Sequence, residues 1–141
     1  MKAIILIGPP GSGKGTQAKL IAEKFGLEYI GSGDSLRKRQ KKNDFSARKL
    51  TKVMNQGKLV PSFVIIKILG DKLEEFKRNK NKNGFVLDGW NRIIYEAILI
   101  DEALEWYDWI KKVKIIFFMF VDYGKLTSAV LQSAEPAIES E

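Results

Sequence analysis

The chain has 141 residues, enough for one ordinary domain, and its 45% hydrophobic and 29% charged residues are typical of globular proteins. It contains neither cysteine nor histidine, which excludes disulfide scaffolds, thiolate zinc sites, cysteine nucleophiles and serine–histidine triads. The formal net charge is +7, and positions 37–82 hold fifteen Lys and Arg residues against four Asp and Glu residues. This excess favours nucleic acid, an anionic membrane or phosphorylated small molecules as partners.

Membrane insertion and secretion are not expected. The longest wholly apolar run, residues 115–121, is far shorter than the ~20 residues that span a bilayer. The apolar N-terminus runs into Gly and Pro without a small-residue cleavage site, so it does not resemble a signal peptide. The lack of cysteine agrees with a reducing compartment, and we expect a cytoplasmic protein.

Strands and helices are expected to alternate along the chain. Continuous apolar runs indicate buried strands, and apolar residues at helical spacing indicate helices. In chain order these patterns predict a strand at 3–7, a helix at 16–25, a strand at 27–30, helices at 35–56 and 62–76, a strand at 85–87, a helix at 93–110 and a strand at 113–121. The aromatic residues at 106–109 follow the helical spacing, so we expect them to pack rather than to stack on bases. The alternation predicts an α/β fold with a parallel sheet.

A glycine-rich loop joins the first strand to the first helix. Gly8-Pro9-Pro10-Gly11-Ser12-Gly13-Lys14-Gly15-Thr16 follows the strand directly. Glycines let backbone N–H groups wrap a phosphate closely, and the helix N-terminus adds partial positive charge. Lys14 is placed to reach the outer phosphates of a nucleotide, and Thr16 to serve a magnesium shell. The alternative, a plain Gly/Pro turn, is disfavoured by the strand–loop–helix context.

This loop, continued as Gly15-Thr16-Gln17, resembles that of adenylate kinase and its relatives among the nucleoside monophosphate kinases. Segments 29–37, 56–61 and 84–92 are similar, in the same order, to the parts with which that family binds its acceptor. The resemblance covers residues 1 to about 122. It implies a sheet of the P-loop NTPase type, ordered 2-3-1-4 with the fifth strand missing and flanked by helices. It also implies a P-loop core at 1–30 and 84–125, a helical insert binding the nucleoside monophosphate at 31–83, and a polar, disordered tail at 126–141.

The resemblance also implies roles for individual residues. ATP would be held by Gly11, Ser12, Gly13, Lys14, Gly15 and Thr16, with Lys14 neutralising its β and γ phosphates. Asp88, with Thr16, would organise water around Mg²⁺, and Arg37 and Arg92 would grip the acceptor phosphate. The rest of the acceptor site would comprise Ser32, Lys58, Leu59, Val60, Gly89, Trp90 and Glu96. Each of these residues also has a purely structural alternative when the resemblance is set aside. Asp88 would cap a turn with Gly89, Arg37 would be one more solvated charge on a basic helix, and Arg92 would lie in the first turn of a helix.

The chain departs from the family pattern at three places. Asn91 stands where the family has proline, which leaves the turn before Arg92 less restricted. Glu96 stands where a glutamine reads the acceptor base, and an ionised carboxylate accepts hydrogen bonds but donates none. The family's lid, further arginines and fifth strand have no counterpart, so we expect an exposed edge on the strand at 113–121. That edge predicts self-association, a partner, or a chain shortened from a longer ancestor.

The sequence therefore predicts a phosphotransferase that moves the γ-phosphate of ATP, with Mg²⁺, to AMP or a related nucleoside monophosphate. One alternative is a nucleotide-binding module that lacks turnover because the lid arginines are missing. A second is nucleic-acid binding through the basic insert, which would weaken steeply with salt; this is the least favoured of the three.

Overall fold

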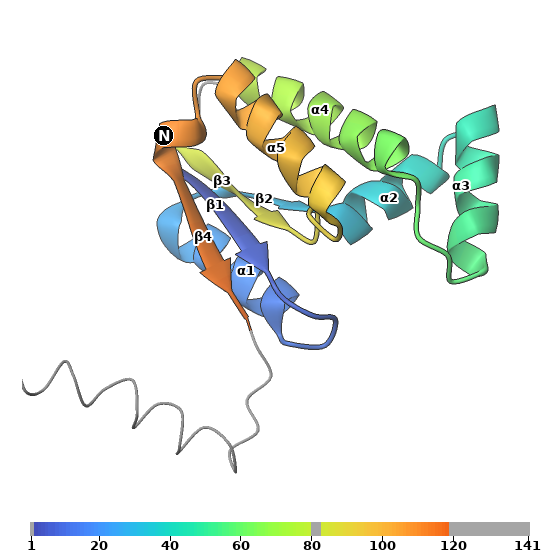
Figure 1. The fold of residues 1–141 in the computed structure, drawn as a ribbon, viewed down its shortest axis with the longest axis horizontal. Helices are drawn as coiled ribbons and strands as arrows, with labels where there is room; N and C mark the ends of the chain where they lie inside the picture. Colours follow the sequence, from blue (N-terminus) through green and yellow to red (C-terminus); the bar gives the residue numbers. More distant parts are fainter. Residues whose placement is uncertain (1, 80–82, 119–141) are drawn as a thin grey trace, which may run out of the picture.

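The computed structural model describes residues 2–79 and 83–118, which form a four-stranded parallel sheet with helices on both faces (Figure 1). The strand order is β2-β3-β1-β4, which confirms the predicted order. The strands are β1 (Lys2–Ile7), β2 (Glu28–Gly31), β3 (Gly84–Asp88) and β4 (Val113–Phe117). The helices are α1 (Lys14–Phe25), α2 (Ser32–Gln40), α3 (Phe45–Asn55), α4 (Ser62–Arg78) and α5 (Ile94–Trp106), with a short 3₁₀ turn at Ile110–Lys112.

The two central strands are apolar along their length because both of their faces are covered. On one face, α1 packs Ala18 and Ala22 against Leu6 and Val86. On the other face, α4 and α5 cover the alternate side chains, which include Phe85 (Figure 1). Strands buried on both faces read as continuous apolar runs, which is why their positions were predictable to within two residues. β1 and β3 run side by side in register from Lys2–Gly84 to Leu6–Asp88, so they end together at one edge of the sheet.

The predicted helix at 35–56 is wrong, because the structure has two helices there. α2 ends at Gln40, and α3 begins after Asp44, whose carboxylate accepts a hydrogen bond from the Ala47 backbone N–H at 2.8 Å. Asp44 has an extended backbone and caps the new helix, so the chain turns there. Figure 1 shows α3 lying away from the sheet, beyond α2. The division into a core at 1–30 and 84–125 and an insert at 31–83 stays a prediction.

The predicted helix at 93–110 is too long. α5 stops at Trp106, since Asp108 adopts a left-handed conformation (φ 60°) and the Trp109 N–H donates to the Leu104 carbonyl at 2.7 Å. This is the Schellman arrangement that closes helices. Trp109 is buried edge-on against Phe76 and Phe85, with ring centroids 5.6 and 5.2 Å away. Packing is thus confirmed for Trp109 but wrong for Trp106, whose side chain is 81% exposed.

β4 lies at one edge of the sheet and pairs with β1. Ile115 and Phe117 are largely exposed on it, and within residues 2–79 and 83–118 no strand covers its outer edge. The end of the predicted strand (119–121) and the predicted tail (126–141) lie outside the described residues. Among the described helices, none is both long enough and apolar enough to cross a bilayer.

Candidate active site

The loop between β1 and α1 has the backbone of an anion cradle. Gly11 and Gly13 have φ of 81° and 77°, values that residues with a Cβ rarely adopt. Gly13 precedes α1, whose first backbone N–H groups have no intrahelical acceptor and form the positive end of the helix. The Ser12 hydroxyl is buried and makes no hydrogen bond within the described part of the chain. The loop therefore offers unpaired donors to a negatively charged group.

Asp88, the last residue of β3, lies beside this loop. Its Oδ1 is 3.6 Å from Lys14 Nζ, and both side chains are mostly buried, at 13% and 16% exposure. Its Oδ2 accepts a hydrogen bond from the Tyr29 hydroxyl at 3.1 Å. Burial, and then the charge of Asp88, raise the pKa of Tyr29 above its usual range, so the phenol is protonated at neutral pH. The Asp88 carboxylate thus lies between a cation and a hydrogen-bond donor.

Arg92 is held by the loop that follows β3. Its Nε donates to the Gly89 carbonyl at 3.2 Å, and its Nη2 donates to Ser32 Oγ at 3.3 Å. Glu96, which is 4% exposed, accepts a hydrogen bond from the Arg92 backbone N–H at 2.8 Å and one from Ser62 Oγ at 3.5 Å. These bonds join α2, α4 and α5 around the loop, and they fix the guanidinium before any ligand arrives.

The two loops face one another across a cleft of about 570 Å³. It lies at the carboxyl ends of β1 and β3, the usual place for ligands in parallel sheets. The lining residues come from the end of β1, the glycine-rich loop, the β3–α5 loop and the segment before α4: Ile7, Gly8, Pro9, Pro10, Lys14, Leu59, Gly89, Asn91 and Arg92. Lys14 and Arg92 are its charged residues, so the cleft suits a ligand with phosphates at both ends.

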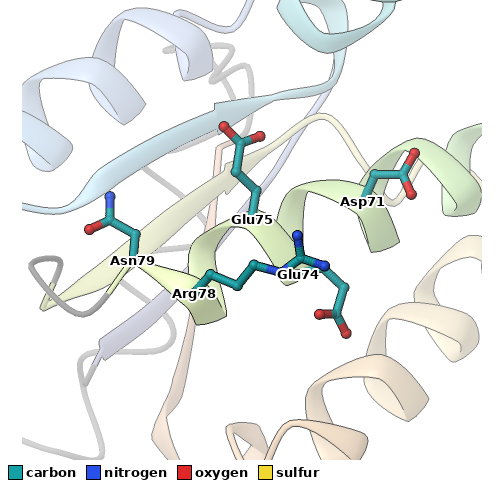
Figure 2. Close-up of a pocket in the computed structure, with 5 residues that line it drawn as sticks. All are labelled: Asp71, Glu74, Glu75, Arg78 and Asn79. Atoms are coloured by element: carbon teal, nitrogen blue, oxygen red, sulfur yellow. The ribbon is translucent and has the colours of Figure 1, made fainter.

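A second hollow of about 500 Å³ lies along the C-terminal half of α4 (Figure 2). Its lining carries three carboxylates and one guanidinium: Asp71, Glu74, Glu75 and Arg78, with Asn79. The net negative charge of this hollow disfavours a phosphate ligand there.

Comparison of the sequence with protein-family models shows to which family the chain belongs. The family model described as adenylate kinase matches residues 6–140, nearly the whole chain. The chain belongs to the adenylate kinase family. The match includes both loops of the cleft, which agrees with the resemblance seen in the motifs.

Several adenylate kinases are close in sequence. The chain is 45% identical to that of Finegoldia magna over 101 residues, which cover 72% of this chain and 46% of the relative. It is 44% identical to that of Clostridium tetani over 102 residues, covering 72% and 46%. It is 46% identical to that of Buchnera aphidicola subsp. Cinara cedri over 127 residues, covering 90% and 54%. The chain therefore spans about half the length of these relatives.

The structure brings many, but not all, of the residues predicted from the adenylate kinase motifs together. Lys14, Leu59, Gly89 and Arg92 line the cleft. Asp88 lies 3.6 Å from Lys14, and Ser32 accepts a hydrogen bond from Arg92, so both adjoin the cleft. Gly11, Ser12, Gly13, Gly15 and Thr16 flank Lys14 in the chain. Glu96 lies behind Arg92, and bonds both to its backbone and to Ser62.

Six of the nine predicted acceptor residues are not among those that line the cleft: Ser32 and Glu96, described above, and Trp90, Val60, Arg37 and Lys58. Trp90 is fully buried, and its indole N–H donates to the Ile30 carbonyl at 2.7 Å. The Val60 side chain is 8% exposed and belongs to the hydrophobic core. Arg37 pairs with Asp34 on the surface of α2, and Lys58 is exposed. The motif specified these positions, but it did not specify which way each side chain points.

Sequence reasoning missed Tyr29 and Ser62, which hold Asp88 and Glu96 respectively. Tyr29 lies in the 29–37 segment but was given no role, and Ser62 follows directly after the 56–61 segment. The sequence did carry a signal for Tyr29. The expected sheet order placed β2 beside β3, and Gly31, two residues after Tyr29, has no side chain that would block the tyrosine ring. Ser62 forms its contact across α4 and α5, and nothing in the spacing of the chain indicated it.

Proposed function

We propose that the chain transfers the γ-phosphate of ATP to AMP or a related nucleoside monophosphate. The observation that carries the proposal is the cleft itself, because Lys14 on its donor side and Arg92 on its acceptor side line the same 570 Å³ space. Phosphoryl transfer is catalysed mainly by positioning and by positive charge, and these two residues supply both.

On the donor side, the glycine-rich loop would hold the phosphates of ATP through backbone N–H groups and Lys14. Residues Gly11 to Thr16 carry this role in the proposal. Lys14 Nζ lies 3.6 Å from Asp88 Oδ1, so a phosphate bound by Lys14 would lie beside this carboxylate. The Ser12 hydroxyl, buried without a hydrogen bond in the described residues, gains an acceptor in a phosphate oxygen.

The residues near the donor phosphates fit Mg²⁺. Asp88 Oδ1 is a buried carboxylate oxygen that accepts no hydrogen bond within the described chain, and Mg²⁺ prefers such hard oxygen ligands. Among residues 2–79 and 83–118, no group of three or more His, Cys, Asp or Glu side chains is arranged so that it could hold a metal ion. The ion would therefore be held largely by ATP and water, with Asp88 and Thr16 in its outer shell. Bound with ATP, it would offset phosphate charge.

On the acceptor side, Arg92 would bind the phosphate of the monophosphate. Its bonds to Ser32 and Gly89 place the guanidinium in advance, which lowers the entropic cost of gripping the phosphate. Arg37 on α2, released from Asp34, would supply the second guanidinium. Leu59 and the backbone of 58–60 would line the nucleoside, and Glu96 would contribute by fixing the Arg92 backbone.

The test is a transfer assay with ATP and Mg²⁺ against AMP, CMP, UMP and dTMP, with Lys14→Ala as the control. The proposal expects transfer to at least one acceptor, and transfer by Lys14→Ala reduced about 10³-fold, as for loss of a charge acting in the transition state. If the wild type turned over no faster than Lys14→Ala, the proposal that the chain is a phosphotransferase would be refuted. Nucleotide binding without transfer would then support the module without turnover. Salt-dependent RNA binding without nucleotide binding would support the nucleic-acid alternative.

Self-association through the edge of 113–121 remains a proposal as well. The open edge of β4 and its exposed Ile115 and Phe117 support it. Sedimentation of the wild type and of Phe117→Lys tests it: a dimer that dissociates in the variant is expected, and two identical monomers would contradict it.

A further inference from the structure

Tyr29 reaches across the sheet to Asp88, 59 residues away in sequence. Gly31 pairs with Asp88 between β2 and β3, and Tyr29 lies two residues before Gly31, on the same face of its strand. The tyrosine side chain runs over Gly31: a Cβ there would overlap the Tyr29 hydroxyl and lie 2.7 Å from Cζ. The missing side chain at position 31 is therefore what lets the hydroxyl reach the carboxylate.

The contact makes the two oxygens of Asp88 unequal. Oδ2 accepts the tyrosine hydrogen bond, and a Cβ at Gly15 would lie only 3.2 Å from it, so the glycine-rich loop closes over this oxygen. Oδ1 is buried, has the Lys14 ammonium 3.6 Å away, and accepts no hydrogen bond from the described residues. Lys19 Nζ lies 5.4 Å from the centroid of the tyrosine ring, within the range of a cation–π contact.

We propose that Tyr29 is a positioning residue for Asp88, made possible by Gly31. Its hydroxyl holds the carboxylate in one rotamer, with Oδ2 anchored and Oδ1 left for the water shell of the Mg²⁺ that arrives with ATP. The inference rests on the proposed function, and it adds a residue that acts through Asp88 without touching nucleotide. It predicts that the metal-dependent part of ATP binding, and not ATP binding as such, depends on one phenolic hydroxyl.

The experiment is calorimetric titration of the full chain with ATP, once in Mg²⁺ and once in EDTA. Tyr29→Phe removes the hydroxyl alone and should weaken binding in Mg²⁺ about 10-fold, the lower end of what a hydrogen bond to a charged group contributes. Its affinity in EDTA should stay within about twofold, because the loop and Lys14 are unchanged. A tyrosine that merely supported the fold would weaken both titrations alike.

Tyr107→Phe is the matched control. It also removes a tyrosine–carboxylate bond, 2.6 Å from Tyr107 Oη to Glu74 Oε1, but at the acidic hollow on α4 (Figure 2). It should change neither titration. Gly31→Ala should reproduce the loss in Mg²⁺, because a Cβ displaces the tyrosine ring. In a Tyr29→Ala background, adding Gly31→Ala should weaken Mg²⁺-dependent ATP binding little further, because the added Cβ no longer meets a tyrosine ring.

Asp88→Asn separates the inference from the proposed function. If it loses the Mg²⁺-dependent part of binding while Tyr29→Phe retains it, the inference is overturned and the role of Asp88 stands. If Asp88→Asn keeps that part, or if the wild type binds ATP equally in Mg²⁺ and EDTA, the proposed role of Asp88 fails and the inference falls with it. Equal losses in both titrations for a folded Tyr29→Phe would also overturn it.

Discussion

Replacing Gly89 by alanine should damage both the stability of the protein and its acceptor site. Gly89 follows β3 and has a φ of 74°, and its carbonyl oxygen accepts a hydrogen bond from Arg92 Nε. A Cβ on it would lie 2.8 Å from Ser32 Oγ, the oxygen that receives the second Arg92 hydrogen bond. One added methyl group therefore strains the backbone and displaces the serine that holds the arginine.

The size of the effect follows from these two contacts. An L-residue in the left-handed region costs about 1–2 kcal/mol. Moving the Ser32 hydroxyl loses a hydrogen bond worth about 1 kcal/mol, and the lower entropy of the unfolded alanine chain returns about 0.5 kcal/mol. The free energy of unfolding should fall by roughly 2 kcal/mol, which lowers the melting temperature by about 8 °C. The freed Arg92 should bind a nucleoside monophosphate about 10-fold more weakly, as expected for one lost charged hydrogen bond.

The assay is urea unfolding followed by circular dichroism, with calorimetric titration of AMP on the folded protein. Gly70→Ala is the matched control: Gly70 lies inside α4, and a Cβ there meets nothing within 4 Å. It should raise the stability by about 0.5–1 kcal/mol and leave AMP binding unchanged. A Gly89→Ala protein as stable as the wild type, or one that binds AMP equally well, would refute the reasoning.

Three further predictions follow from contacts described above. Trp90→Phe should lower the free energy of unfolding by about 2 kcal/mol, because it leaves the Ile30 carbonyl unpaired and opens a cavity. If the variant instead bound AMP more weakly without losing stability, Trp90 would be an acceptor-binding residue and this prediction would be wrong. Arg92→Lys keeps the charge but loses the planar fork, so AMP affinity should fall about 10-fold while ATP affinity stays within twofold; equal AMP affinity by calorimetry contradicts this. The Arg39 hydrogen bond, and then the Ala47 N–H, lower the pKa of Asp44, so its stabilisation is present above about pH 4 and is lost as the pH falls through the lowered value. The free energy of unfolding of Asp44→Ala should therefore differ from that of the wild type more at pH 7 than below the lowered pKa of Asp44; a difference that does not change with pH would show that the charge is irrelevant.

The sheet could be predicted from the sequence because its strands are buried on both faces. Ile4 and Ile5 in β1 and Val86 and Leu87 in β3 alternate between the two helix layers, and all four must be apolar. The glycine-rich loop was equally readable, since the backbone at Gly11 and Gly13 requires residues without a Cβ. These features depend on local patterns, and the strand order came with the family motifs.

The helix ends were less predictable because each depends on a single residue. Asp44 caps α3, four residues after α2 ends at Gln40, within a run rich in Lys and Arg. Asp108 takes a left-handed conformation that most non-glycine residues avoid, and it turns Trp109 out of the helix and into the core. The capping signal at Asp44 was present in the sequence, whereas the conformation of Asp108 was not marked by any neighbour.

The candidate site was predictable in its segments but not in the direction of each side chain. Trp90 lies next to Gly89 in the same motif, yet its indole packs in the core and leaves the cleft to Gly89 and Arg92. Tyr29 was overlooked because its bond to Asp88 forms only once β2 and β3 are paired in register. Such contacts depend on tertiary structure, and spacing along the chain does not encode them directly.

The most direct test of the account is the affinity of the folded chain for ATP in Mg²⁺, measured by calorimetry beside Lys14→Ala and the surface variant Lys111→Ala. Lys14 lines the cleft with its ammonium 3.6 Å from Asp88, whereas Lys111 is exposed in the 3₁₀ turn before β4. The account predicts binding by the wild type and by Lys111→Ala, and at least about 10-fold weaker binding by Lys14→Ala. Equal affinities for all three proteins, or no heat of binding from folded wild type, would contradict it.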